Sequence, residues 1–248
     1  MSVDKGSAVR DLFDRIAARY DLANTAMTAG IDELWRRQAV GLLQVANDGH
    51  LLDLCCGTGA LSRDLARIVP EGLVDGVDFS AKMLEVARAR RSPGNIVYHQ
   101  ADVLALPFPN DFFDGAAMGY SLRNIVDVPA CLREITRVLK PGASFVNLEV
   151  SKPPNPMWRR LFYAYFYRVA PVIGRVAGGD APAYRYLPQS LVNFPDADGL
   201  AELFKENGFA HVRYVGLFGG AAALHIGTKE RVPVTGERAA SLTADLLA

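Results

Sequence analysis

"LLDLCCGTGALSRDL", residues 51–65, decides the fold of this chain. An apolar run leads to Asp53, a glycine turn follows at Gly57 and Gly59, and the residues after the turn have the spacing of a helix. A strand, a tight turn and a helix in this order form the first corner of a nucleotide-binding fold, because glycine lets the backbone approach a ligand and the helix start presents free N–H groups. The dinucleotide fingerprint G-x-G-x-x-G is incomplete, since Ser62 stands at the third glycine position.

Apolar patterning predicts alternating strands and helices on both sides of this stretch. Strands are expected at 50–55, 72–78, 95–100, 113–119 and 143–150, and helices at 7–20, 32–45, 60–69, 80–91, 127–139 and 196–207. Pro141 and Gly142 are expected to separate the helix at 127–139 from the strand that follows it. Two more strand patterns lie around Gly219-Gly220 within 209–229, and paired glycines are a hairpin signal. The pattern predicts an α/β fold with a doubly wound, mostly parallel sheet and an antiparallel edge strand.

The spacing of these elements also predicts the domain organisation. We expect one domain over residues 1–231, with N-terminal cap helices within 7–45, followed by a C-terminal appendage at 232–248. The segment 151–190 is too long for an ordinary connection. We therefore expect it to form a helical lid insertion with a functional role.

The composition excludes several classes of protein. Half of the 248 residues are hydrophobic, and Lys+Arg and Asp+Glu balance at 27 each, so no overall field favours nucleic acid as a partner. No apolar run reaches the roughly 20 residues of a membrane-spanning helix, and the N-terminus shows no signal peptide. The three cysteines, Cys55, Cys56 and Cys131, fit no zinc spacing. We expect a reduced, cytoplasmic protein without a metal, whose cysteines are small core residues.

Three carboxylates at strand ends indicate the kind of ligand. Asp78 ends the second strand of the nucleotide-binding unit, where it would accept hydrogen bonds from the two hydroxyls of a ribose. Asp102 follows the third strand and would accept a hydrogen bond from an adenine amino group. Asp53 precedes the glycine turn, where a carboxylate repels a pyrophosphate but suits a cationic amino or sulfonium group. These residues favour S-adenosylmethionine, a methyl donor, over NAD.

Several motifs resemble those of a known family. Class I S-adenosylmethionine-dependent methyltransferases, which have a Rossmann-like fold, show successive motifs similar to the opening stretch and to "GVDFSAKMLEVAR", "ADVLALPFPNDFFD" and "ITRVLKPGA". More narrowly, the ubiquinone/menaquinone biosynthesis C-methyltransferase family resembles this chain, in order over about residues 10–229, at "FDRIAARYDLAN", "MGYSLRNIVD" and "FGGAAALHIGTK". The double cysteine and "GYSLRN" lean toward its demethylphylloquinol/demethylmenaquinol branch.

The resemblance implies methylation of a ring carbon on a polyprenylated quinol in quinone biosynthesis. The acceptor would be demethylmenaquinol, demethylphylloquinol or a benzoquinol relative. A second hypothesis is a small-molecule methyltransferase of secondary metabolism that acts on another phenolic or polyketide-like acceptor. A third is a non-enzymatic module, which would have no reason to keep all three carboxylates. The ring type, the tail length and the oligomeric state, with a homodimer as one candidate, stay open.

The resemblance also implies site residues. Binding of the donor is assigned to Asp53, Gly57, Thr58, Gly59, Asp78, Phe79, Asp102, Val103 and Gly119, with no metal. Catalysis is assigned to Tyr20, Arg123, Asn124 and His225.

Two positions depart from the family pattern. Cys55 replaces the usual glycine or alanine, and Gly119 replaces a donor-binding serine, for which the nearby Ser121 is a weak substitute.

Arg123 is the residue that we expect to stabilise the charge developing on the quinol oxygen, because a guanidinium stays charged and donates hydrogen bonds in pairs. The alternative is a surface arginine that caps the helix near residue 127.

The identity of the general base stays open. His99, His211 and His225 are candidates by residue type, and loss of the proton to water beside Arg123 is equally compatible with the sequence.

The lid insertion carries an aromatic stripe and an unbalanced charge. Helical spacing joins Trp158, Leu161, Phe162, Tyr165, Phe166 and Val169. Positive charge comes from Arg159, Arg160, Arg168 and Arg175, and no acid occurs between Glu149 and Asp180. One interpretation is a helix packed on the core. The other is a lid, over 157–176, that holds a prenyl tail and makes a peripheral contact with the inner face of an anionic membrane.

Overall fold

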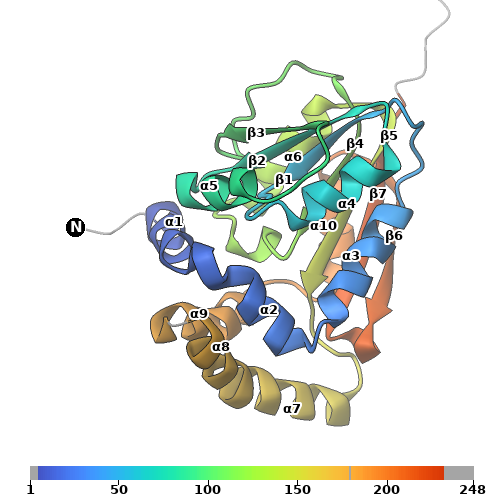
Figure 1. Cartoon of the computed structure of the whole chain (residues 1–248). Helices are drawn as coiled ribbons and strands as arrows, with labels where there is room; N and C mark the ends of the chain where they lie inside the picture. The colour runs from blue at the N-terminus through green and yellow to red at the C-terminus, as the bar shows by residue number, and fades with distance from the viewer. Residues whose placement is uncertain (1–4, 179, 232–248) are drawn as a thin grey trace, which may run out of the picture.

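A computed structural model describes residues 5–178 and 180–231, so the appendage expected at 232–248 lies outside the described residues. Within these ranges, seven strands form one sheet in the order β3-β2-β1-β4-β5-β7-β6 (Figure 1). The strands are β1 His50–Leu54, β2 Leu73–Asp78, β3 Ile96–Gln100, β4 Phe113–Gly119, β5 Leu139–Val150, β6 Phe209–Leu217 and β7 Ala222–Lys229. β7 runs antiparallel to β5 and β6, and the other neighbours pair in parallel. The mostly parallel sheet is confirmed, with its antiparallel strand one place in from the edge.

Helices cover both faces of the sheet. They are α1 Lys5–Ile16, α2 Tyr20–Thr28, α3 Ile31–Gly41, α4 Ala60–Ile68, α5 Ala81–Ala89, α6 Val128–Val138, α7 Pro156–Ala164, α8 Ala170–Gly178, α9 Ala181–Val192 and α10 Ala197–Glu206. α3 and α4 pack on one face through side chains such as Val40 and Leu65. α6 and α10 pack on the other face through side chains such as Ile135 and Phe204. The core is therefore split into two layers by the sheet.

The local sequence explains several of these elements. Ser80 and Asp196 begin α5 and α10, because their side-chain oxygens accept the N–H groups of Met83 and Gly199 at 3.1 and 2.9 Å. β1 reads as a nearly continuous apolar run because it lies inside the sheet and is covered on both faces. The capping residues therefore set where these two helices begin, and the apolar run of β1 sets its place inside the sheet.

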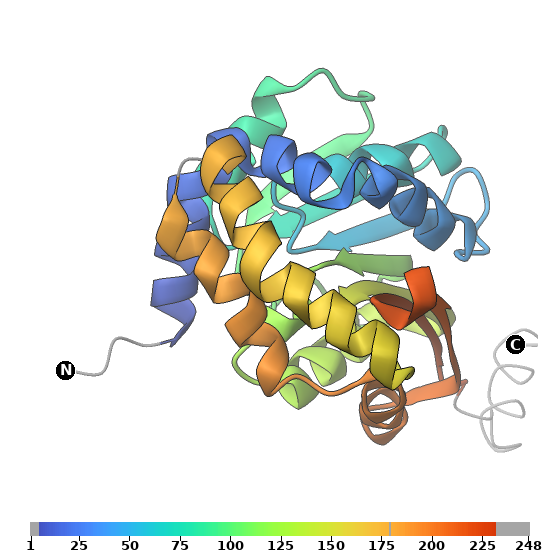
Figure 2. The same ribbon diagram turned by 90° about the horizontal axis from the view of Figure 1, so that it is seen from below.

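The cap and lid helices lie together at the carboxyl edge of the sheet (Figure 1). The single helix expected at 7–20 is two helices, α1 and α2, joined by a 3-10 turn at Ala17–Arg19 and reaching Thr28. In the lid, α7, a π-helical turn at Tyr165–Val169 and α8 follow one another across the outside of α2 (Figure 2). The Tyr165 hydroxyl donates a hydrogen bond to the carbonyl of Met27 and ties the two layers together. Among the described residues, no helix combines the length and apolar composition needed to cross a membrane.

β5 begins at Leu139, earlier than the start expected at residue 143, so Pro141 and Gly142 lie inside the strand. Its pairing with β4 shifts register between Phe113 and Gly115. Gly142 has a φ of +86°, which glycine adopts without strain. An irregular strand end of this kind accommodates a proline, which has no N–H group to donate to the ladder.

We predict that Phe204→Ala lowers the free energy of unfolding by about 3–5 kcal/mol, because it empties a fully buried aromatic site. The Phe204 ring centroid lies 5.4 Å from that of Phe145 and 5.3 Å from that of Phe209, which joins α10 to β5 and β6. Urea denaturation measures the change. Val215→Ala, on an exposed position of β6, is the control and should shift stability by less than about 0.5 kcal/mol. Equal stability of the two variants would contradict this packing.

Candidate active site

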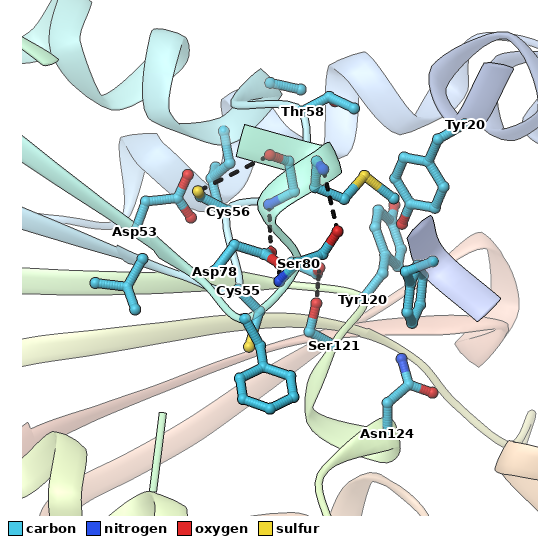
Figure 3. Close-up of a pocket in the computed structure, with 18 of the residues that line it drawn as sticks. Tyr20, Asp53, Cys55, Cys56, Thr58, Asp78, Ser80, Tyr120, Ser121 and Asn124 are labelled. Carbon is cyan, nitrogen blue, oxygen red and sulfur yellow. Dashed lines mark hydrogen bonds between the residues drawn. The ribbon is translucent and has the colours of Figure 1, made fainter. Parts of the chain in front are cut away.

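A cavity of about 480 Å³ opens at the carboxyl ends of β1, β2 and β4 (Figure 3), and we call it the polar cavity because Asp53, Asp78 and Asp102 line it. The strand order changes direction between β1 and β4, and ligands of doubly wound sheets bind at such a switch point. Of the residues predicted from the sequence, its lining contains Tyr20, Asp53, Gly57, Thr58, Asp78, Phe79, Asp102, Val103, Gly119 and Asn124. The fold thus gathers at one place side chains from strand ends far apart in the chain.

The loop after β1 enters the left-handed region of backbone conformation three times. The φ angle is +53° at Cys55, +54° at Gly57 and +75° at Gly59. Glycine adopts these values freely, whereas Cys55 does so under strain, which is typical of residues held at functional sites. Burial raises the pKa of the Cys55 and Cys56 thiols well above the usual range, so both stay protonated. Both are free thiols at the wall of the cavity, with Cys56 buried and Cys55 half-buried.

Gly59 packs against Tyr98 and is not part of the cavity lining. A Cβ atom at Gly59 would lie 2.2 Å from the Tyr98 hydroxyl, so a larger residue does not fit there. Ser62, which breaks the dinucleotide fingerprint, donates a hydrogen bond from Oγ to Asp53 Oδ2 at 2.5 Å. The serine at this position therefore gives a buried carboxylate one of the partners that it needs.

Asp53 is a buried carboxylate with one oxygen left unpaired. It is 1% exposed, and its Oδ1 has no hydrogen-bond partner among the described residues. Burial raises the pKa of Asp53 to about 7, although the hydrogen bond from Ser62 opposes the shift. A desolvated acceptor without a partner, at the wall of a cavity, suits a cationic ligand. An unpaired acceptor oxygen at this position fits the ammonium group of S-adenosylmethionine, which donates hydrogen bonds.

Asp78 and Asp102 are oriented by backbone N–H groups. Asp78 Oδ2 accepts a hydrogen bond from Gly57 and Oδ1 accepts one from Ser80, both at 2.8 Å. Burial raises the pKa of Asp78. Asp102 Oδ1 accepts the N–H group of Leu104 at 2.9 Å. Each of these oxygens keeps a second acceptor position, so both carboxylates can still receive hydrogen bonds from a ligand.

The cap helices close the polar cavity through contacts that sequence analysis missed. Thr58 Oγ1 donates a hydrogen bond to Asp21 Oδ1 of α2 at 2.7 Å, and Ser80 Oγ donates one to Asp14 of α1. Neither acid carries a local signal, because charged residues on an amphipathic helix are ordinarily assigned to the solvent face. The contacts join the N-terminal segment directly to the loops that follow β1 and β2.

An apolar cavity, also of about 480 Å³, lies between the cap, the lid and the ends of β5 and β7. The lid contributes Trp158, Leu161, Phe162, Tyr165 and Phe166 to its lining. Val169, the sixth residue of the predicted stripe, is outside the lining and 45% exposed. Phe162 and Phe166 are also buried in the core, so the stripe is at once a packed helix face and a cavity wall.

The polar and apolar cavities meet. Five residues line both, and we call them the common wall: Phe13, Tyr20, Asn24, Asp32 and Tyr120. Figure 3 shows Tyr20 and Tyr120 on the same side of the polar cavity, with Asn124 below them. The two cavities are therefore adjacent, and ligands bound in them can meet beside these shared side chains.

Arg123 is buried beside the apolar cavity. Its Nη1 forms an ion pair with Glu149 and donates a hydrogen bond to the Tyr120 carbonyl at 2.5 Å. Its Nε donates a hydrogen bond to Ser190 Oγ of the lid at 3.2 Å. The alternative of a surface arginine that caps the next helix is wrong, since Arg123 is 7% exposed and Asp127 caps α6. Asn124 lies beside it, with its Oδ1 buried and unpartnered among the described residues.

The structure places His225, assigned to catalysis from the sequence, away from both cavities. It lies on β7 and faces α10, where its Nε2 is 2.8 Å from the carbonyl oxygen of Ala197, so its ring reaches neither cavity. His99 is bound to Asp75, with 2.6 Å between Nε2 and Oδ1. His211 lies at an irregularity of the edge strand β6. None of the histidines in the described part of the chain lines either cavity.

The family profile and the most similar relatives that we compared belong to the same kind of enzyme. The profile of the ubiE/COQ5 methyltransferase family matches residues 1–229. The chain is 40% identical over 233 residues to the demethylmenaquinone methyltransferase of Desulfitobacterium hafniense, with 92% of each sequence covered. It is 43% identical over 238 residues to the demethylmenaquinone methyltransferase of Symbiobacterium thermophilum, covering 92% of this chain and 95% of the relative.

Solved structures agree on the fold. A SAM-dependent methyltransferase from Thermotoga maritima superposes with a TM-score of 0.66 at 20% identity, covering 89% of this chain and 99% of that chain. A chain from a complex of the Haloferax volcanii Trm112 methyltransferase activator with a methyltransferase superposes with a TM-score of 0.67 at 18% identity, covering 88% of this chain and 98% of that chain. The class I methyltransferase fold expected from the motifs is thereby confirmed.

We predict that donor affinity rises with pH because of Asp53. Its pKa of about 7 in the free protein means that a bound ammonium group, which favours the carboxylate, must displace a proton. The dissociation constant of S-adenosylhomocysteine should therefore fall about tenfold between roughly pH 6 and pH 8. Calorimetric titration measures it. Asp53→Asn should bind more weakly and lose the slope, whereas Glu202→Gln, far from the cavity on exposed α10 surface, should keep it. A wild-type affinity independent of pH would overturn the assignment of Asp53.

Proposed function

The chain belongs to the ubiE/COQ5 methyltransferase family and is a methyltransferase, and we propose that its acceptor is a demethylmenaquinol-type quinol with a prenyl tail. The observation that carries the proposal is the common wall, where a polar cavity suited to a cationic donor meets an apolar cavity suited to a lipid-like acceptor. The names of the relatives support a naphthoquinol ring. A small phenolic acceptor of secondary metabolism would leave much of the apolar cavity unfilled.

In the proposed complex, the polar cavity holds the donor. Asp53 accepts hydrogen bonds from its ammonium group, Asp78 from its ribose hydroxyls and Asp102 from its adenine amino group. When bound, S-adenosylmethionine supplies an electrophilic methyl group on a sulfonium centre. The loop after β1 and the closed cap exclude water and orient the donor toward the common wall. Orientation of this kind contributes on the order of 7–11 kcal/mol to a bimolecular reaction.

In the apolar cavity, the acceptor ring exchanges one hydrogen, lost as a proton, for the methyl group that it gains. Ionisation of the neighbouring hydroxyl makes the ring carbon nucleophilic, and in this proposal Arg123, which lines the cavity, stabilises the resulting oxygen charge. Its Nη1 and Nε are already engaged, so it donates to the acceptor with Nη2 and not with the paired N–H groups expected from the sequence. Since no histidine of the described chain lines either cavity, we assign the proton to water at the cavity rim.

The direct test is methylation of a short-chain demethylmenaquinol, kept reduced, with product identified by mass spectrometry. We expect the quinol to be methylated and the oxidised quinone to be inert, because the quinone has no hydroxyl to ionise. Arg123→Lys should lower kcat by about 10- to 100-fold while donor affinity stays near the wild-type value, since lysine keeps the charge but loses the guanidinium geometry. Arg133→Lys, which alters a contact to Asn207 outside both cavities, is the matched control. Faster methylation of phenols without a tail would favour the secondary-metabolism alternative.

We also propose that the outer face of α7 and α8 rests on an anionic lipid surface, from which a prenylated acceptor would enter. Exposed apolar side chains on this face include Met157 at 77%, Val172 at 50% and Val176 at 75% exposure. They alternate with exposed Arg159, Arg160, Arg168 and Arg175. Apolar groups that insert and cations that pair with phosphate are the features of a peripheral membrane contact.

We predict that the protein floats with vesicles rich in phosphatidylglycerol and stays in solution with phosphatidylcholine alone. The double variant Arg159→Ala/Arg160→Ala should weaken vesicle binding by about tenfold or more, because each lysine or arginine near an anionic surface contributes about 1 kcal/mol. Raised salt should have the same effect. Val215→Ser, at another exposed apolar position, should leave binding unchanged. Equal binding to both lipids would contradict an anionic contact.

A further inference from the structure

Tyr120 occupies an unusual position in the common wall. It follows the last residue of β4, has a φ of +57° and lines both cavities. Its backbone is held on both sides, because its N–H group donates to the Leu148 carbonyl at 2.7 Å and its own carbonyl accepts a hydrogen bond from Arg123. A bulky residue held in the left-handed region is a strained arrangement that persists where the surroundings enforce it, and such residues cluster at functional sites.

The Tyr120 hydroxyl is buried and has no hydrogen-bond partner among the described residues. Neither of two neighbouring carboxylates, Asp32 and Glu149, forms a hydrogen bond with it. Asp32 accepts hydrogen bonds from Thr28 and Arg36, and Glu149 is paired with Arg123. A buried hydroxyl without a partner is costly, so its partner must come from outside the chain.

The neighbouring Tyr20 is in a different situation. Burial raises the pKa of Tyr20 and a hydrogen bond with the Asn24 side chain opposes that rise, and the Tyr20 hydroxyl is not one of the described buried polar atoms that lack a partner. Tyr120 is therefore the phenol of the common wall that is free to serve a ligand, and the cavities are the space from which that ligand can reach it.

We propose that the Tyr120 hydroxyl donates a hydrogen bond to a ring oxygen of the quinol, and so acts as a further catalytic residue in the methyl transfer. The inference rests on the proposed function, because it needs an acceptor with an oxygen beside the reacting carbon. A donor aimed at this oxygen stabilises the charge that develops when the hydroxyl ionises, and it is worth more in a cavity that excludes water than in solution.

The electrostatic surroundings decide which role the phenol can take. Burial, together with the charge of Asp32, raises the pKa of Tyr120 far above its ordinary value. The phenol therefore stays protonated throughout the working pH range. It can donate a hydrogen bond to the acceptor but cannot act as the general base that removes a proton from it.

The test is Tyr120→Phe, which removes only the hydroxyl. We expect kcat to fall about 10- to 100-fold, the effect of losing one hydrogen bond to a charged group, with donor affinity unchanged. The deficit should shrink for a ring-halogenated quinol, whose hydroxyl ionises more readily and needs less help. Tyr214→Phe makes the same change on β6, where the hydroxyl donates to Asp198, and should leave kcat unaltered. A deficit of the same size with every acceptor would show a structural role and overturn the proposal.

A measurement without turnover separates this proposal from the proposed function. A hydrogen bond to a ring oxygen lowers the carbonyl stretching frequency of a bound, carbon-13-labelled naphthoquinone in infrared difference spectra. The band should lie at lower frequency in the wild type than in Tyr120→Phe, and the same frequency in both would overturn the role of Tyr120. Failure of the wild type to methylate any quinol would instead overturn the proposed function, whatever the spectra show.

Discussion

The site depends on the buried ion pair between Arg123 and Glu149. Glu149 comes from β5, Arg123 from the turn after β4, and through Ser190 and the Tyr120 carbonyl the same guanidinium reaches the lid and the common wall. One side chain thus fixes the relative positions of sheet, wall and lid. Removing one partner of such a pair ordinarily costs about 3–5 kcal/mol, because an uncompensated charge is left in the interior. The arrangement makes the acceptor side of the site a product of the folded core and not of a mobile loop.

The donor side depends on the opposite feature, since two carboxylates there, Asp53 and Asp78, form no ion pair with any of the described residues. Asp53 and Asp78 have raised pKa values because the cavity wall excludes water from them. A ligand that brings positive charge relieves this cost, whereas a pyrophosphate would increase it. The selectivity between a sulfonium nucleoside and a dinucleotide therefore follows from the first strand and its acid. The second cavity, whose lining is mostly apolar, then favours an acceptor with a large apolar surface.

Much of this could be read from the sequence, because strand ends of a parallel sheet must converge. That constraint predicts that Asp53, Asp78 and Asp102 lie close together, and all three line the polar cavity. His225 was proposed from its family-like motif, and a motif does not say which face of the sheet a strand residue will join; its side chain faces α10 and lines neither cavity. Glu149 was missed because its partner Arg123 is distant in sequence, and an acid inside an apolar strand has no local signal. The strain at Tyr120 is equally invisible, since only tertiary contacts hold its backbone at a positive φ.

The central claim is that donor and acceptor meet across the common wall. A crystal structure of the chain with S-adenosylhomocysteine and a short-chain naphthoquinone tests it most directly. The account predicts the adenosyl group among Asp53, Asp78 and Asp102, with the sulfur facing the wall and the quinone ring in the apolar cavity beside Arg123. A ring bound outside that cavity, or a donor turned so that its sulfur faces away from the wall, would contradict it.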